Sequence, residues 1–213
     1  MPRCSVVIPQ KGNDKMTRDI VDSLRVYEPD IQIIVIHDHH EKIDPIPGAT
    51  VELNRSYGVT AAWNHGCELA TGDWIIVMNN DVICSGPCVD LLIESAGTGI
   101  SGVGGRKESM IGAYAEDLPG GKDSIWAMGW CFCFCRNLFE DLIGFDETLK
   151  YYFSDLDFQV RAKLKGLPIT PIACPTLRHI GHATANKMLG KRALWGADRE
   201  AFVRKIKAGE FSK

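Results

Sequence analysis

Short apolar runs alternate with stretches of helical periodicity in the first 80 residues. Residues 5–9, 31–37 and 74–78 are almost entirely apolar, and residues 50–53 are expected to form a further short strand. Apolar runs of this length are typical of strands that are buried on both faces. They predict the strands of a largely parallel sheet.

Helical periodicity fills the intervals between these runs. Apolar residues follow helical spacing over residues 17–27 and again over residues 60–70. Gly72 stands after the second of these, where a glycine often ends a helix. Strands that alternate with helices predict an α/β fold with helices on both faces of the sheet.

The pattern is weaker in the second half of the chain. Residues 97–123 hold many of the glycines and are expected to form loops with short strands. We expect strands over 126–135 and 169–173 and helices over 137–142 and 155–165. No repeat or linker interrupts the pattern, so we expect one domain over residues 1–213.

Charge is distributed unevenly around a net charge of -3. Nine Lys or Arg residues and three acidic residues lie between Arg178 and Lys213. We therefore divide the chain into a core, residues 4–185, and a basic, helical C-terminal segment, residues 186–213. This segment is either a site for a polyanion such as nucleic acid or the solvated face of a helix.

The eight cysteines are expected to pack in the core of a protein in a reducing compartment, since no pairing typical of a zinc site occurs among them. No apolar run reaches the roughly 18 residues that a membrane span needs. The first residues do not resemble a signal peptide. We expect a cytoplasmic location.

Polar residues follow three of the predicted strands. Pro9 precedes Gln10, His37 precedes Asp38, and Asn79–Asp81 follow the third strand. Ligands of open α/β sheets bind at the carboxyl ends of the strands. Asn79–Asp81 offer oxygen ligands for Mg²⁺ or Mn²⁺ beside a diphosphate, although Asn and Asp also favour turns and helix N-caps.

The segment from Asn54 to Asp81 resembles the donor half of family 2 glycosyltransferases of the GT-A fold, in the rhamnosyltransferase-like branch. The family's ordered pattern of N-x-x-x-G, N-x-G and A-x-G-D/E is matched by Asn54, Gly58, Asn64, Gly66, Ala70, Gly72 and Asp73. Asn79-Asn80-Asp81 resembles the family's D-x-D-like triplet in an N-x-D variant. The resemblance spans about residues 4–185.

The resemblance implies a single GT-A-like α/β/α sandwich with a mostly parallel central sheet. It implies that Asp81 ligates a divalent metal and that Asp38 contacts the nucleoside. The other donor-binding residues that it implies are Pro9, Asn54, Gly58, Asn64 and Asn80.

Two later blocks extend the resemblance. Gly144-Phe145-Asp146-Glu147 and the segment from Tyr152 to Arg161 resemble the family's G-F-D-E and E-D-x-D-x-x-x-R blocks, with Ser154 in place of the usual glutamate. By resemblance, Asp155 is the general base and Asp157 lies near the acceptor. Both aspartates also fit the capping of a helix N-terminus, and we interpret Arg161 as a structural residue.

The segment from Leu177 to Thr184 resembles the family's late H-x-G-x-x-S segment, which makes His179 the expected second metal ligand and His182 a less favoured one. Trp130 is a candidate for acceptor contact. Trp126 and Tyr151 are candidates for stacking on a sugar, although each also fits a core position.

The resemblance implies an inverting glycosyltransferase that uses a UDP- or dTDP-linked sugar and Mn²⁺ or Mg²⁺. The acceptor would be a hydroxyl of a soluble glycan or of a modified DNA base. The alternatives are a nucleotidyltransferase, whose Gly-rich loop is poorly matched by residues 10–13, and a non-catalytic nucleotide-sugar-binding protein.

Overall fold

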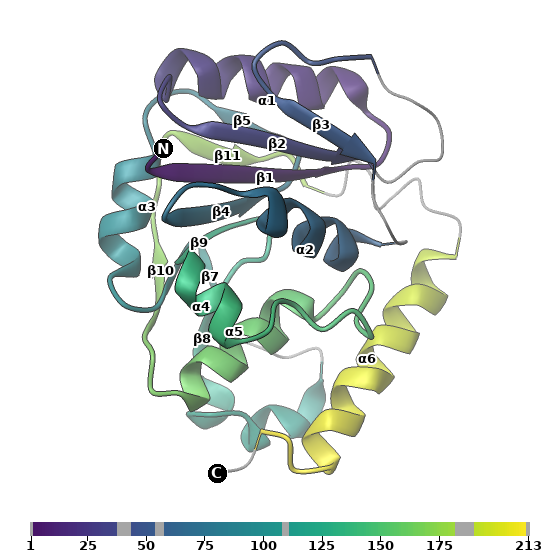
Figure 1. Ribbon diagram of the computed structural model, residues 1–213. Helices are drawn as coiled ribbons and strands as arrows, with labels where there is room; N and C mark the ends of the chain where they lie inside the picture. Colours follow the sequence, from purple (N-terminus) through teal and green to yellow (C-terminus); the bar gives the residue numbers. More distant parts are fainter. Residues whose placement is uncertain (1, 38–43, 54–57, 108–110, 182–189, 212–213) are drawn as a thin grey trace.

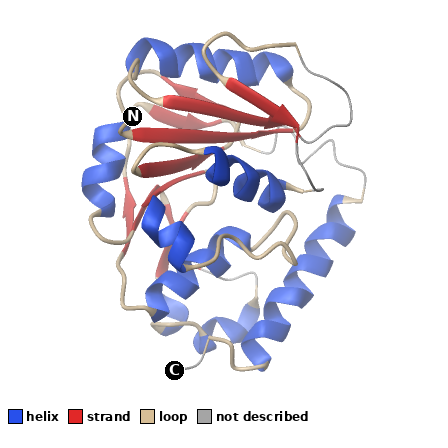
Figure 2. Ribbon diagram, in the orientation of Figure 1, coloured by secondary structure: helices blue, strands red, loops and turns tan. Residues whose placement is uncertain are grey.

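The computed structural model describes residues 2–37, 44–53, 58–107, 111–181 and 190–211. Its centre is a seven-stranded sheet (Figures 1 and 2). In order across the sheet, the strands are β3 (Thr50–Leu53), β2 (Gln32–His37), β1 (Cys4–Gln10), β4 (Trp74–Met78), β9 (Cys131–Cys135), β6 (Ile100–Val103) and β10 (Ile169–Ile172). Only β9 is antiparallel to its neighbours β4 and β6, so the predicted, mostly parallel sheet is confirmed.

Helices cover both faces of this sheet, because its central strands are apolar on both sides. Val6 and Ile8 of β1 pack toward α1 (Asp14–Tyr27) and α3 (Val89–Ala96). Val7, between them, packs toward α2 (Val59–Leu69), α4 (Arg136–Asp141) and α5 (Ser154–Leu164). The three layers give the predicted α/β/α sandwich.

A third apolar cluster joins α5 to the C-terminal helix α6 (Lys191–Lys207). Phe202, Val203 and Ile206 of α6 pack in the same cluster as Leu156 and Val160 of α5. The 3₁₀ helices η1 (Gly112–Asp117) and η2 (Gly121–Asp123) lie in the connection that precedes β8. The helical C-terminal segment was predicted, whereas its burial against α5 was not.

Two predicted boundaries are wrong. Residues 126–135 do not form one strand: β8 (Ile125–Ala127), which pairs with β7 (Gly105–Lys107), is separated from β9 by a turn. Gly72 does not end α2, since Ala70 is the capping residue. A Cβ at Gly72 would lie 2.6 Å from the carbonyl carbon of Cys4, so glycine is needed there for close approach to β1.

Three short elements were not predicted. They are α3 and the two strands of a separate antiparallel pair, β5 (Val82–Cys84) and β11 (Leu177–His179). A strand of three residues is too short for its polar and apolar alternation to stand out in the sequence. This pair matters because β5 follows the Asn79–Asp81 triplet directly and β11 carries His179.

The cysteines pack as predicted. All eight are free thiols, and only Cys135 is less than fully buried. Burial raises the pKa of the Cys4 thiol to about 12, as expected for cysteines that behave as small apolar residues. Among the described residues, no helix has the length and apolarity that crossing a membrane requires.

Replacing Ile143 by Asn is expected to stabilise the protein by about 1 kcal/mol. Ile143 has a φ of 57°, a left-handed conformation that a β-branched residue adopts at a cost, and its side chain is 92% exposed. Asn tolerates this conformation better and no packing is lost. Denaturant unfolding of both proteins measures the difference, and a destabilised Ile143→Asn variant would contradict the expectation.

Candidate active site

The Asn79–Asp81 triplet lies at the carboxyl end of β4, between two backbone partners. The amide of Asn79 donates to the carbonyl of Trp130 at 2.8 Å, and the amide of Ile180 donates to the carbonyl of Asp81 at 2.9 Å. These bonds connect the triplet to the residues that precede β9 and follow β11. Because β9 runs antiparallel, its first residues lie at the same sheet edge as the last residues of β4.

His179 lies directly beside Asp81, although 98 residues separate them in the sequence. The pairing of β11 with β5 sets His179 opposite Val82. It leaves Nε2 of His179 2.9 Å from Oδ1 of the buried Asp81. The indole ring of Trp130 stacks on the imidazole with a centroid distance of 5.1 Å and an interplanar angle of 6°. The imidazole is therefore fixed by Trp130 on one face and by Asp81 at its edge.

Asp155 lies in the first turn of α5, against the turn that leads into β9. A Cβ at Gly129 would overlap the Asp155 carboxylate, so only glycine allows this approach. Gly129 directly precedes Trp130, whose ring contacts His179. The β8–β9 turn thus connects Asp155 to the pair of Asp81 and His179.

Gln159 fixes this turn to α5, a role that the sequence did not reveal. Its side chain is fully buried. Oε1 accepts from the Ala127 amide at 2.8 Å, while Nε2 donates to the carbonyls of Ala127 and Asp155, both at 3.1 Å. A buried amide with both ends bonded to the backbone holds two segments in register.

Lys11 and Tyr151 connect the loop between β1 and α1 with the loop before α5. Nζ of Lys11 donates to the Tyr151 hydroxyl at 3.2 Å and lies 5.3 Å from the centroid of the phenol ring. The two residues are 140 positions apart. Tyr151 therefore belongs to the site region. Trp126 takes the core position that was its alternative to stacking on a sugar, since it is buried in the core.

Residues 5–109 match the family described as Glycosyl transferase family 2. This part of the chain belongs to a family 2 glycosyltransferase domain. The matched region includes β1, the Asn79–Asp81 triplet and the helices between them. This outcome confirms the predicted family and enzyme class.

The proteins that this chain resembles match it at low sequence identity. It is 23% identical over 231 residues to the O-antigen biosynthesis protein RfbC of Myxococcus xanthus, a match that covers 87% of this chain and 18% of that protein. The structure of mannosyltransferase PcManGT from Pyrobaculum calidifontis, in complex with GDP-Man and Mn²⁺, superposes with a TM-score of 0.66 and 16% identity, covering 96% of this chain and 64% of that one.

The catalytic domain of Drosophila β1,4-galactosyltransferase 7, in complex with xylobiose, superposes with a TM-score of 0.59 and 15% identity. That match covers 91% of this chain and 79% of the other. The glycosyltransferase therefore spans most of a catalytic domain of this fold, but less than a fifth of the RfbC relative.

The pair of Asp81 and His179 fits a divalent cation. Two ligands of one octahedral ion, each about 2.1 Å from it, lie roughly 3 Å apart, and the two side-chain atoms here are 2.9 Å apart. Imidazole is a transition-metal ligand and carboxylate suits Mn²⁺ and Mg²⁺. No group of three His, Cys, Asp or Glu residues suited to a metal is found within the described part of the chain.

Asn80 supports the loop between β1 and α1 through two hydrogen bonds. Its Nδ2 donates to Oγ1 of Thr17 at 3.0 Å and to the carbonyl of Gly12 at 3.4 Å. Asn80 is buried, and Gly12 and Asn13 both have positive φ in the turn that it supports. Asn80 thus positions the loop between β1 and α1, and its donor-binding role stays a prediction.

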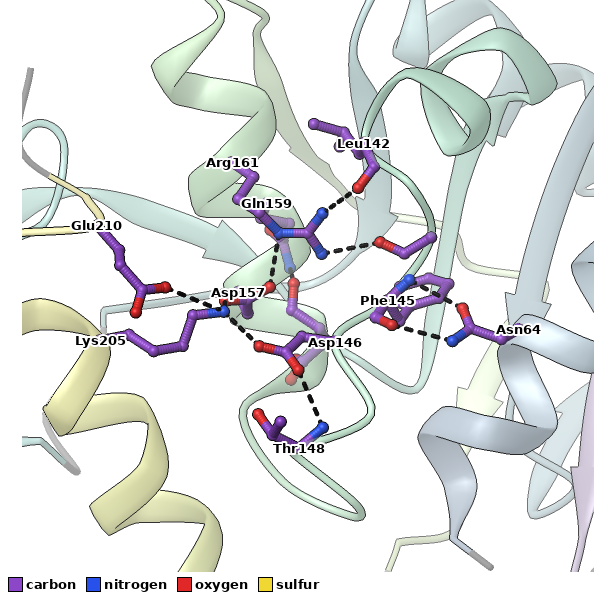
Figure 3. A network of polar contacts seen from close by, with 12 residues as sticks. Asn64, Leu142, Phe145, Asp146, Thr148, Asp157, Gln159, Arg161, Lys205 and Glu210 are labelled. Atoms are coloured by element: carbon purple, nitrogen blue, oxygen red, sulfur yellow. Dashed lines mark hydrogen bonds and ion pairs between the residues drawn. The ribbon is translucent and has the colours of Figure 1, made fainter. Parts of the chain in front are cut away.

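Asn64, another predicted donor-binding residue, bonds the loop before α5. Its Oδ1 accepts from the amide of Phe145 at 2.8 Å, and its Nδ2 donates to the carbonyl of Phe145 at 2.9 Å (Figure 3). Nδ2 also donates to Oε1 of Glu147 at 3.0 Å. Both ends of the side chain are thus used within the protein. Asn64 holds the Gly144–Glu147 loop against α2, and its donor-binding role stays a prediction.

Asp157, predicted near the acceptor, is instead buried in an ion-pair network. Its carboxylate is 0% exposed and bonds Nε of Arg161 at 2.7 Å and Nζ of Lys205 at 2.5 Å (Figure 3). Arg161 also donates to the carbonyls of Leu142 and Gly144, at 2.6 and 2.9 Å. The acceptor role of Asp157 is therefore wrong, and the structural role of Arg161 is as predicted.

Lys205 completes this network from α6. It pairs with Asp146 at 2.5 Å as well as with Asp157. Burial alone would raise the pKa of Asp146 and lower that of Lys205. For Asp146, the bonds from Lys205 and Thr148 outweigh burial, so its pKa is lowered. For Lys205, the attraction of Asp157 and Asp146 outweighs burial, so its pKa is raised. Lys205 was interpreted as part of a solvated or polyanion-binding face, and neither reading fits this residue.

The remaining predicted donor residues lie near the same edge of the sheet or outside the described residues. Asp38 and Asn54, as well as the less favoured ligand His182, fall outside them. Pro9 is half-buried near the end of β1, opposite Ile36. Gly58 precedes α2 with a φ of 118°, and a Cβ there would lie 2.7 Å from the carbonyl oxygen of Lys150.

Gln10 was not singled out by the sequence. It ends β1 and is 1% exposed. Its Nε2 donates to Asp14 at 2.6 Å, while Oε1 has no hydrogen-bond partner among the described residues. A buried acceptor without a partner is costly unless a ligand supplies the donor.

Proposed function

We propose that the chain transfers a sugar from a UDP- or dTDP-linked donor to an acceptor hydroxyl with inversion at the anomeric carbon. Asp155 would act as the general base, and Asp81 with His179 would hold Mn²⁺ or Mg²⁺. The β8–β9 turn carries this proposal, because Gly129 contacts Asp155 and the adjacent Trp130 contacts His179. Base and metal ligands thus lie on two sides of one short turn.

Asp155 has the chemistry that a single displacement requires. Its carboxylate takes the proton of the acceptor hydroxyl while that oxygen forms a bond to the anomeric carbon. The bond from the anomeric carbon to the diphosphate oxygen breaks at the same time, and the nucleoside diphosphate leaves. Attack opposite the leaving group inverts the anomeric centre. One carboxylate suffices for this route, whereas a retaining route through a covalent intermediate needs a second one as nucleophile.

The donor would bind along the carboxyl ends of β1, β2 and β4. A divalent cation bound by Asp81 and His179 would neutralise the diphosphate and ease its departure. Lys11 lies in the loop between β1 and α1, which Asn80 supports. It would add a positive charge near the diphosphate. Oε1 of Gln10, which has no hydrogen-bond partner within the described part of the chain, would accept from an N–H of the nucleoside base. Pro9 and Asp38, which follows β2 in the sequence, are the other residues proposed to bind the nucleoside.

For the acceptor we propose the hydroxyl of a glycan. The relative from Myxococcus xanthus is described as an O-antigen biosynthesis protein, which supports this choice. A modified DNA base is the competing acceptor, and the exposed cations of α6, Arg192, Arg204 and Lys207, are the feature that favours it. Salt-sensitive DNA binding that disappears when residues 187–213 are removed would support the DNA acceptor.

The proposed function is tested by incubating the chain with UDP-, dTDP- and GDP-linked sugars, with Mn²⁺ or with EDTA. Released nucleoside diphosphate is measured with water, oligosaccharides or DNA as acceptor. We expect metal-dependent release from one nucleotide series, faster with a glycan. Pyrophosphate release from a nucleoside triphosphate and a sugar phosphate would instead indicate a nucleotidyltransferase. No release from any donor sugar would contradict the proposal.

A further inference from the structure

Helix α6 contacts the chain immediately before the start of α5. Its Asp198 is 5% exposed and accepts three backbone amides in a row. Oδ1 accepts from Lys150 at 3.2 Å, and Oδ2 accepts from Tyr151 at 2.8 Å and from Tyr152 at 2.9 Å. One carboxylate on α6 therefore fixes the loop that presents Tyr151 to Lys11.

The same helix supports a strained residue next to the proposed base. Phe153 precedes α5 with a φ of 65°, a left-handed conformation that aromatic residues avoid. Its ring stacks on Phe202 of α6, with centroids 5.5 Å apart and planes 17° apart, and lies 6.1 Å from the ring of Trp195. Asp155 follows two residues later. Strain at a functional position persists only where surrounding contacts impose it, and α6 supplies these contacts.

The third contact lies beyond Asp155. Lys205 of α6 pairs with Asp157 in the first turn of α5 and with Asp146 in the preceding loop. The helix thus contacts the chain before the proposed base through Asp198, beside it through Phe202 and after it through Lys205. Figure 1 shows α6 running alongside this part of the molecule, from the loop before α5 toward the C-terminus.

We propose that α6 is the element that positions the catalytic base and the acceptor-side loop, with Asp198 as its principal positioning residue. The inference rests on the proposed function, in which Asp155 is the base. Asp198 acts through the amides of Lys150–Tyr152 and does not touch the reacting atoms. The buried side of the basic C-terminal helix therefore supports the proposed base from a distance, a role that its charge alone does not suggest.

An Asp198→Asn variant tests this proposal, because Asn keeps the size of the side chain but removes one of its two acceptors. An NH₂ group would then face one of the loop amides. We expect the kcat for donor turnover to fall about 10- to 100-fold, as small displacements of catalytic groups do, while the KM for the nucleotide sugar stays within about twofold. Glu200→Gln makes the same change of charge on the exposed side of α6 and is expected to match the wild type.

Hydrogen exchange of the Lys150–Tyr152 amides provides a readout that needs no substrate. We expect these amides to exchange at least tenfold faster in Asp198→Asn, while those of α2 and β4 stay unchanged. If Asp155→Asn is inactive, a kcat of Asp198→Asn within twofold of the wild-type value would overturn the proposal. A loss of both donor binding and global stability in Asp198→Asn would overturn it as well. If the wild type itself turns over no donor, the proposed function fails instead, and unchanged exchange at Lys150–Tyr152 would still overturn the positioning role.

Discussion

Replacing Asp155 by Asn is expected to lower kcat by about 10²- to 10⁴-fold, the range that a general base contributes. Asn has the same shape, so it preserves the contact with Gly129 and the first turn of α5. It cannot accept the proton of the acceptor hydroxyl. Donor binding should persist, because the substitution leaves the pair of Asp81 and His179 unchanged.

This prediction is measured by steady-state turnover of the donor and by calorimetric binding of the matching nucleoside diphosphate. Asp141→Asn is the matched control, since Asp141 is exposed at the end of α4. It should leave kcat unchanged. An Asp155→Asn variant that retains a tenth or more of the wild-type kcat would contradict the role of Asp155 as base.

Replacing Lys205 by Met is expected to lower the free energy of unfolding by about 3 kcal/mol, as breaking a buried ion pair does. The Lys205 side chain is 13% exposed and Asp157 is 0% exposed. Without the ammonium, Asp157 keeps only Arg161 as its cation, and Asp146 loses its charged partner. Met preserves most of the apolar volume, so the change isolates the charge.

Urea unfolding measures this loss, with Lys207→Met as the control on the exposed side of the same helix. The control should change the free energy of unfolding by less than about 0.5 kcal/mol, as is usual for surface substitutions. If the two variants lost the same amount of stability, the buried network would not be the stabilising contact that the geometry indicates.

The stability gap between wild type and Lys205→Met should also depend on pH. The folded pKa of Asp146 is lowered, so its contribution is complete above the ordinary aspartate pKa of about 4 and is lost as the pH falls through the folded value. The folded pKa of Lys205 is raised, so its contribution is complete below about 10.4 and is lost as the pH rises through the folded value. The gap is therefore constant near neutral pH and shrinks in acid.

The sequence predicted the elements whose pattern is local. The strands at β1, β2 and β4 are apolar on both sides because helices cover both faces, and that is visible in the order of residues alone. The short strands β5 and β11 carry no such pattern. Their pairing, which brings His179 to Asp81, depends on residues 98 positions apart.

The polar residues whose partners the sequence did not predict share one physical reason. Asn64, Asp157 and Lys205 are polar residues of ordinary type, and their roles are set by partners elsewhere in the chain. Asn64 bonds Phe145, 81 residues away, and Lys205 bonds Asp157, 48 residues away. Lys205 belongs to a basic run that resembles a solvated helix face, but one side of α6 is buried against α5. Periodicity cannot show which basic residue of such a helix faces inward.

The most direct test of a metal-dependent donor site is calorimetric titration of UDP, dTDP and GDP, each with and without Mn²⁺, into the wild type and the Asp81→Ala variant. We predict that one nucleotide binds the wild type only when Mn²⁺ is present and that Asp81→Ala abolishes this binding. Failure of every nucleotide to bind the wild type in the presence of Mn²⁺, or undiminished binding by Asp81→Ala, would contradict a donor site built on Asp81 and His179.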